Sequence, residues 1–234
     1  HYAAKAPTPG KSFGYMRFEI LAALANAVVL LGVTAYILYE AYRRFVEPNE
    51  ILGWPMMLVA LVGLGVNLVS MKLLAGGSSE SLNVKGAYFE VFSDMLGSVG
   101  VILAALVVMA TGWAWVDPLV GAGIGLFIVP RTWRLLNEAL HILLEGTPPG
   151  VDLATLKAEI EAIPGVRRAS DLHAWTLTSG FDAMSGHVVV DDLASGPGVI
   201  RTIRQLMKER YGIEHVTVQV EDEALAAEAA ILPV

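Results

Sequence analysis

The sequence has no cysteine and few charged residues. The absence of cysteine from all 234 residues excludes disulfide bonds and every metal site with a thiolate ligand. A metal bound by this chain must therefore use histidine, carboxylate or backbone oxygen. Charged residues make up only 17% of the chain and hydrophobic residues 55%, whereas a soluble domain has about 25% charged residues. This composition predicts that most of the chain lies in a membrane.

Several motifs are missing as well. The formal net charge is −7 and there is no long basic run, which argues against nucleic acid as a partner. No His-Glu-x-x-His, Gly-x-Ser-x-Gly or Walker loop is found, so we expect that the protein is not an enzyme. The chain begins at His1 without methionine or a signal-peptide pattern, and we expect it to be a fragment of a longer protein.

Long apolar runs fill the first 145 residues. Residues 20–39 are uncharged, and twenty helical residues extend about 30 Å, the thickness of a bilayer core. Three further runs have enough length and hydrophobicity to span a membrane. The sequence predicts four transmembrane helices, over about residues 18–42, 51–74, 84–110 and 114–144.

The distribution of Lys and Arg around these runs predicts their orientation. One side of the membrane would carry only Arg43 and Arg44. The other would carry Lys5, Lys11, Arg17, Lys72, Lys85, Arg131 and Arg134. Residues 1–145 are expected to form a transmembrane domain. Because the more basic side faces the cytoplasm, the domain that follows them is expected to be cytoplasmic.

Residues 146–222 have the pattern of a small α+β domain. Asp152 is a predicted N-cap for a helix that ends near Ile163, and a second helix is expected over 197–210. Strands are expected over 168–178, 183–190 and 215–221. This order favours an open-faced sandwich like a ferredoxin fold without its first strand. The alanine-rich tail, residues 223–234, is expected to be frayed or disordered.

The most informative residues are two acids in the third apolar run, Glu90 and Asp94. Side chains four residues apart lie on one face of a helix, so both carboxylates can contact the same ligand. An ionised group at bilayer depth costs at least about 2.5 kcal/mol, so two like charges require a cation or protons. A divalent metal ion meets that requirement. The alternative is that both acids lie at the interface and pair with Lys85, Arg17 or Lys72.

Small and polar residues within the spans have simpler explanations. Gly97, Gly100 and Ala104 continue along the helix of the two acids and would let a neighbouring helix approach. The glycines at positions 121, 123 and 125 are likewise explained by packing. Asn26 and Asn67 are each expected to form interhelical hydrogen bonds rather than to be ligands.

The C-terminal domain holds three histidines on its expected strands, His173, His187 and His215. Asp171 and Glu221 are close to them in sequence. Neutral histidine and carboxylate suit Zn²⁺ and similar ions, although no local spacing forces these residues to converge. Solvent-facing or core histidines remain the alternative.

Four segments together resemble the cation diffusion facilitator family, and its cobalt-zinc-cadmium efflux branch most closely. They are SFGYMRFEILAALANA, NVKGAYFEVFSDMLGSVGV, EALHILLEGTP and DLHAWTLTSGFDAMSGHVVV, and the resemblance covers residues 5–222 in order. It implies a homodimeric metal-cation/proton antiporter with six transmembrane helices and a cytoplasmic domain. The four spans would correspond to family helices three to six, with the first two helices missing from this chain.

The resemblance also implies a set of site residues. Family members bind the transported ion with two ligands from helix two and two from helix five, the latter usually His-x-x-x-Asp. Glu90 and Asp94 occupy the helix-five positions, so this half of the site contains only oxygen ligands. Zn²⁺ is the expected ion, with Co²⁺, Cd²⁺ and Ni²⁺ as alternatives. A cytoplasmic metal site would use Asp171, His187 and Glu221, since Ser170 replaces a histidine of relatives.

These observations predict efflux of a divalent metal cation by proton antiport across the inner membrane. The expected partners are membrane lipid, a second copy bound through the cytoplasmic domain, and protons as counter-ions. The alternative is a membrane-anchored metal sensor that acts through its cytoplasmic domain.

Overall fold

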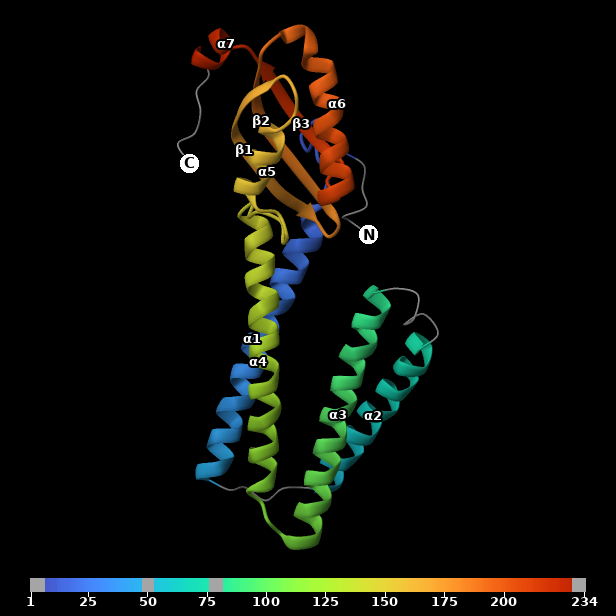
Figure 1. The fold of residues 1–234 in the computed structure, drawn as a ribbon. Coiled ribbons are helices and arrows are strands. Elements are labelled where there is room, and N and C mark those ends of the chain that lie inside the picture. The colour runs from blue at the N-terminus through green and yellow to red at the C-terminus, as the bar shows by residue number, and fades with distance from the viewer. Residues whose placement is uncertain (1–6, 48–52, 76–81, 229–234) are drawn as a thin grey trace. The chain divides into compact units, whose positions relative to one another are not determined.

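The computed structural model describes residues 7–47, 53–75 and 82–228 (Figure 1). Within the third range, the side chains of residues 82–87, 89 and 90 are not described. The chain forms two compact units, one made of residues 28–133 and the other of residues 1–27 with 134–234.

Long helices build the unit of residues 28–133. They are most of α1 (Arg17–Val46), all of α2 (Gly53–Ala75) and α3 (Leu82–Thr111), and the first part of α4 (Val116–Leu143). Each is long and apolar enough to cross a membrane, and together they make four such helices in the described part of the chain. Their surfaces are rich in exposed apolar side chains, as lipid-facing helices require. The four predicted spans are thereby confirmed as helices.

Two helix pairs are recognisable within this unit. Gly125 of α4 faces α1 so closely that a Cβ atom there would lie 2.7 Å from a methyl carbon of Leu38. Arg44 of α1 also reaches Asp117 of α4, with Nη1 2.9 Å from Oδ2. The other pair is α2 and α3, which lie side by side (Figure 1). The packing explanation for the α4 glycines is therefore confirmed at Gly125.

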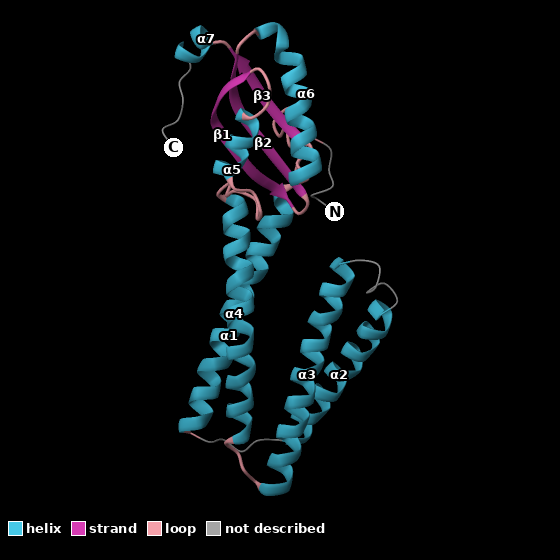
Figure 2. Ribbon diagram, viewed as in Figure 1, coloured by secondary structure: helices cyan, strands magenta, loops and turns pink. Residues whose placement is uncertain are grey.

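The other unit contains an α+β domain with a three-stranded sheet (Figure 2). Strands β1 (Val166–Thr178) and β2 (Phe181–Val190) form an antiparallel hairpin, and β3 (His215–Glu221) pairs with β2 in parallel. Two helices complete the domain, α5 (Leu153–Glu161) and α6 (Gly196–Leu206). The short helix η1 (Leu193–Ser195) precedes α6, and the π-turn η2 (Met207–Tyr211) follows it.

The core of this domain lies between the sheet and its two helices. Leu156 and Ile160 of α5 and Ile203 of α6 are completely buried against Met184 and Val188 of β2. Asp152 caps α5, because its carboxylate accepts hydrogen bonds from the amide and the hydroxyl of Thr155. These features confirm the expected α+β domain with helices on one face of its sheet.

The tail differs from the expectation. We expected residues 223–234 to be frayed or disordered, but Glu223–Glu228 forms the short helix α7, and Ala226 on it is buried. Asp222 precedes this helix, and its carboxylate accepts a hydrogen bond from the amide of Leu225. The N-terminal cap stabilises a turn that composition alone did not reveal. Residues 229–234 lie outside the described part.

Candidate functional site

Helix α3 carries both acids of the predicted transport site. The backbone of Glu90 lies within the helix, but its side chain lies outside the described part. Asp94 follows one turn later, early in the membrane-length segment Val91–Thr111. Ser98, one turn further on, donates a hydrogen bond from its hydroxyl to the backbone carbonyl of Asp94 at 3.1 Å. Helical geometry thus places both acids on the same side of α3.

Asp94 lines a cavity of about 970 Å³ within the unit of residues 28–133. Side chains from α2, α3 and α4 form its walls, and most of them are apolar. The polar members include Asn67 of α2, Ser93 and Ser98 of α3, and Arg131 of α4. Asp94 is an exposed residue on the wall of this cavity, so its carboxylate is accessible to a cation that enters.

The close approach between α2 and α3 is not where the sequence predicted it. A Cβ atom at Gly97 or Gly100 would have no described atom within 4 Å apart from its own helix and neighbours, so these glycines are not needed for contact there. Gly63 of α2 instead faces α3, with Ser98 Oγ 3.5 Å from the position of a Cβ. Ala104 is buried as expected. The sequence pattern identified the right helix but did not identify the contacting glycine on its neighbour.

A second group of candidate ligands lies on the sheet of the C-terminal domain. His187 Nδ1 donates a hydrogen bond to Glu221 Oε1 at 2.8 Å, and His187 Nε2 lies 3.8 Å from Asp171 Oδ2. Glu221 is only 2% exposed and also accepts a hydrogen bond from Gln219 Nε2 at 2.6 Å. The structure therefore brings together the three residues that were predicted as cytoplasmic ligands.

An irregularity in β1 positions Asp171. The pairing register of β1 with β2 shifts between Ser170 and His173, and Asp171 has a φ of 50°, which is rare for a residue other than glycine. At this bulge Asp171 Oδ1 lies 2.9 Å from His173 Nε2 while its other oxygen faces His187. Strained backbone of this kind is common at functional sites, because the surrounding structure must hold it.

The four side chains form a chain of pairs: His173, Asp171, His187 and Glu221. In the described part of the molecule, no three His, Asp or Glu side chains are grouped so that they could hold one ion together. His173 belongs to this group, although the predicted ligand set omitted it. The Asp-x-His spacing at the bulge was the available signal. His215 does not belong to it, since its ring contacts Phe13 and Phe181.

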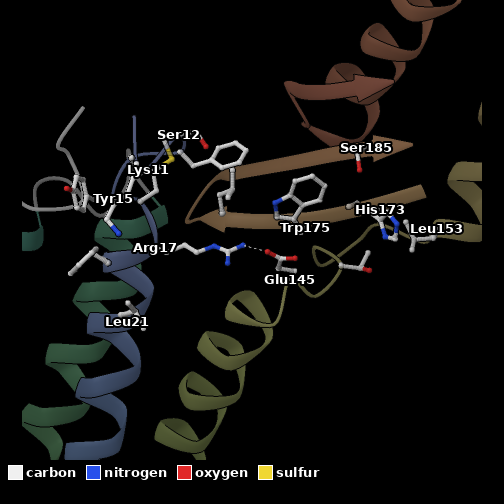
Figure 3. Close-up of a pocket in the computed structure, with 18 residues that line it drawn as sticks. Lys11, Ser12, Tyr15, Arg17, Leu21, Glu145, Leu153, His173, Trp175 and Ser185 are labelled. Atoms are coloured by element: carbon white, nitrogen blue, oxygen red, sulfur yellow. Dashed lines mark hydrogen bonds and ion pairs between the residues drawn. The ribbon is translucent and has the colours of Figure 1, made fainter. Parts of the chain in front are cut away.

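Another cavity, of about 810 Å³, lies in the unit that contains the C-terminal domain. Its walls come from residues 10–21, from the segment after α4 and from β1 and β2 (Figure 3). Arg17 and Glu145 point toward each other there and form an ion pair at 2.8 Å (Figure 3). Lys11 lies in the same wall, with Nζ 5.6 Å from the centre of the Tyr15 ring.

Glu19 also joins the start of α1 to the C-terminal domain. Its two carboxylate oxygens accept hydrogen bonds from the hydroxyls of Thr178, at 2.6 Å, and Ser179, at 3.1 Å. Thr178 ends β1, and Ser179 lies in the turn to β2. These contacts could not be predicted from the sequence, because nothing in the local pattern relates an acid in the first turn of a span to a distant hairpin.

Two family models match the chain. The model described as the cation efflux transmembrane domain matches residues 1–144, and the model described as the cation efflux protein, cytoplasmic domain, matches residues 148–223.

Curated relatives match along almost the whole chain. The metal cation efflux system protein CzcD of Cupriavidus metallidurans is 52% identical over 221 residues, which are 93% of this chain and 70% of that protein. The cadmium, cobalt and zinc/H(+)-K(+) antiporter of Bacillus subtilis is 41% identical over 235 residues, covering 98% of this chain and 75% of the relative.

One solved structure, the metal-bound C-terminal domain of the CzcD transporter from C. metallidurans, is 40% identical to the aligned residues. It covers 30% of this chain and 99% of its own, with a TM-score of 0.29.

Proposed function

Since this chain belongs to the cation efflux family, we propose that it exports a divalent metal cation from the cytoplasm across the inner membrane in exchange for protons. It is a transporter and not an enzyme. The relatives are named as efflux or antiport proteins for metal cations, and the three metals in one of those names, cadmium, cobalt and zinc, are all among the expected ions. Nickel is a further candidate for the cargo.

The observation that carries this proposal is the position of Asp94. Its carboxylate lines a large, mainly apolar cavity, and it belongs to a helix segment of membrane length. Glu90 lies one helical turn before it, so the pair offers oxygen ligands to one ion. Divalent cations bind such ligands only when the acids are deprotonated, which makes metal binding and proton binding compete.

That competition gives a simple exchange mechanism. On the cytoplasmic side the deprotonated acids bind the cation and lose their mutual repulsion. On the other side protons displace the cation and neutralise the acids, which lowers the cost of returning them through an apolar environment. Transport in one direction requires that the two access states bind the ion with different affinities.

The C-terminal domain has a regulatory role in this proposal. Residues 146–222 form a cytoplasmic domain that pairs with a second copy of the chain, consistent with the match to a cytoplasmic domain model. Asp171, His187 and Glu221 are the proposed metal ligands there; in the described part of the molecule they meet only in pairs, so metal binding requires the three side chains to rearrange around the ion. The contacts that support the site are the two short distances from His187 to these acids.

Transport by everted membrane vesicles tests the proposal directly. With the whole protein in the membrane, Asp94→Ala is expected to abolish metal uptake driven by a proton gradient, because it removes a ligand and a proton acceptor together. Glu90→His is expected to keep uptake and to shift its metal preference, since imidazole favours Zn²⁺ over harder ions. Glu47→Ala is the matched control, because Glu47 is an exposed acid just beyond α1. Normal uptake by Asp94→Ala would refute the site.

A metal sensor is the second candidate, and the cluster around His187 favours it. In that case metal would bind to the C-terminal domain while vesicles with the unchanged protein show no metal-coupled proton flux. The two measurements together separate a sensor from a transporter.

A further inference from the structure

Asn67 lies on the less exposed face of α2. Its neighbours Val66 and Leu68 have exposed fractions of 59% and 51%, whereas Asn67 itself is half-buried. Ala60 and Gly63, at helical spacing from Asn67, are also buried or half-buried. Asn67 and Gly63 both line the cavity that contains Asp94. The amide is thus presented to the interior of the unit.

The contact between α2 and α3 sets which residues lie at the same level. Gly63 faces Ser98, with 3.5 Å between the Cβ position of the glycine and Ser98 Oγ. The two helices form a hairpin and run antiparallel (Figure 1). One turn forward along α2 leads from Gly63 to Asn67, and one turn back along α3 leads from Ser98 to Asp94. This register places Asn67 opposite Asp94.

We propose that Asn67 determines the metal specificity of the transport site, by adding its amide oxygen to the ligands of the cation that Asp94 binds. This inference rests on the proposed transport function. A carboxamide oxygen is a neutral ligand, so it adds coordination without adding a charge that would hold the ion too tightly. With Glu90 and Asp94 it extends a set that contains only oxygen.

The number and type of ligands then favour some ions over others. Zn²⁺ is satisfied by four ligands with nitrogen or sulfur among them, while Co²⁺ and Mn²⁺ accept more oxygen ligands at higher coordination number. Loss of the Asn67 oxygen therefore weakens Co²⁺ transport more than Zn²⁺ transport. The sequence predicted only an interhelical hydrogen bond for Asn67. If that were its whole role, its loss would affect the transport of all metals equally.

The test compares the uptake of Co²⁺ and Zn²⁺ in everted vesicles that contain the whole protein. Asn67→Leu keeps the size of the side chain and removes its polar atoms. It is expected to lower kcat/KM for Co²⁺ relative to Zn²⁺ by about tenfold or more, because loss of even an outer-shell partner of a metal ligand costs about 10–100-fold in metal affinity. Asn67→Asp restores an oxygen ligand, and it is expected to return the ratio toward that of the unchanged protein.

Asn26→Leu is the matched control, because Asn26 is an exposed asparagine in the apolar part of α1. It is expected to leave the ratio unchanged. A Co²⁺/Zn²⁺ ratio in Asn67→Leu within twofold of the unchanged protein would overturn the inference, even if Asp94→Ala abolishes transport. If Asn67→Leu fails to reach the membrane, Asn67→Ala gives the same comparison, because it also removes the amide oxygen. Failure of the proposed function shows separately, as normal uptake by Asp94→Ala.

Discussion

Replacement of Glu221 by alanine tests the cluster in the C-terminal domain. The Glu221 carboxylate is almost fully buried and accepts hydrogen bonds from His187 and Gln219. Without it, the half-buried His187 donor loses its partner, which costs about 1–3 kcal/mol. Gln219 is exposed and can form a hydrogen bond to water instead, so the loss of its bond to Glu221 adds little to the destabilisation. We expect a total loss of about 2 kcal/mol in the free energy of unfolding.

Thermal unfolding of residues 146–234 measures this loss. In a domain of this size, 1 kcal/mol corresponds to about 4–8 °C, so Glu221→Ala is expected to lower the Tm by roughly 10 °C. Asp191→Ala is the control, because the ion pair between Asp191 and Arg167 is more than half exposed on both sides and contributes less than about 1 kcal/mol.

The same experiment with metal tests whether Glu221 is a ligand. Zn²⁺ that binds only the folded domain raises its Tm. We expect this rise in the unchanged domain and in Asp191→Ala, but not in Glu221→Ala. Equal Tm losses in Glu221→Ala and Asp191→Ala would refute the reasoning about burial. A full Zn²⁺ response in Glu221→Ala would refute the ligand assignment.

Two further predictions concern the supports of the C-terminal domain. Glu19→Ala removes the acceptor for the hydroxyls of Thr178 and Ser179, so amide hydrogen exchange in the β1–β2 turn is expected to accelerate. Glu19→Gln keeps one acceptor oxygen and is expected to retain more protection from exchange. Unchanged exchange in Glu19→Ala would contradict the contact. The hydrogen bonds from Thr155 lower the pKa of Asp152, so its stabilising effect is complete above its ordinary pKa of about 4 and is lost as pH falls through the lower folded value. Asp152→Ala is therefore expected to lower the Tm at neutral pH. Below about pH 4 the Tm of this variant is expected to fall less with pH than the Tm of the unchanged domain, as measured by thermal unfolding across that range. The same dependence of Tm on pH in both proteins would contradict the cap.

Much of the fold follows from local pattern in the sequence. Uninterrupted apolar runs such as residues 20–39 predict helices of membrane length, because a helix satisfies its own backbone groups in lipid. The alternation in His215–Glu221 predicts a strand, and the Asp152 cap predicts the start of α5. The short helix α7 escaped prediction, since its alanine-rich sequence has no long periodic pattern to distinguish it from a frayed end.

Some candidate residues could likewise be recognised from the sequence, and others only from the structure. Glu90 and Asp94 could be identified from the sequence alone, because an ionisable pair inside an apolar run is costly and needs an explanation. Helical spacing, which is local, also places them on one side of α3. Asn67 could be recognised only as a polar residue in a span. Its position opposite Asp94 depends on the contact between Gly63 and Ser98, which lie on different helices.

The sequence by itself thus determined the membrane helices, the order of elements in the C-terminal domain and the acids of the proposed transport site, because each depends on residues close together in the chain. The tertiary structure decided which distant residues meet. The parallel pairing of β3 with β2 brings Glu221 to His187, and a bulge with a left-handed residue turns Asp171 toward the same histidine. Pairing register and helix contacts are set by the packing of whole elements against each other, and no local pattern encodes them.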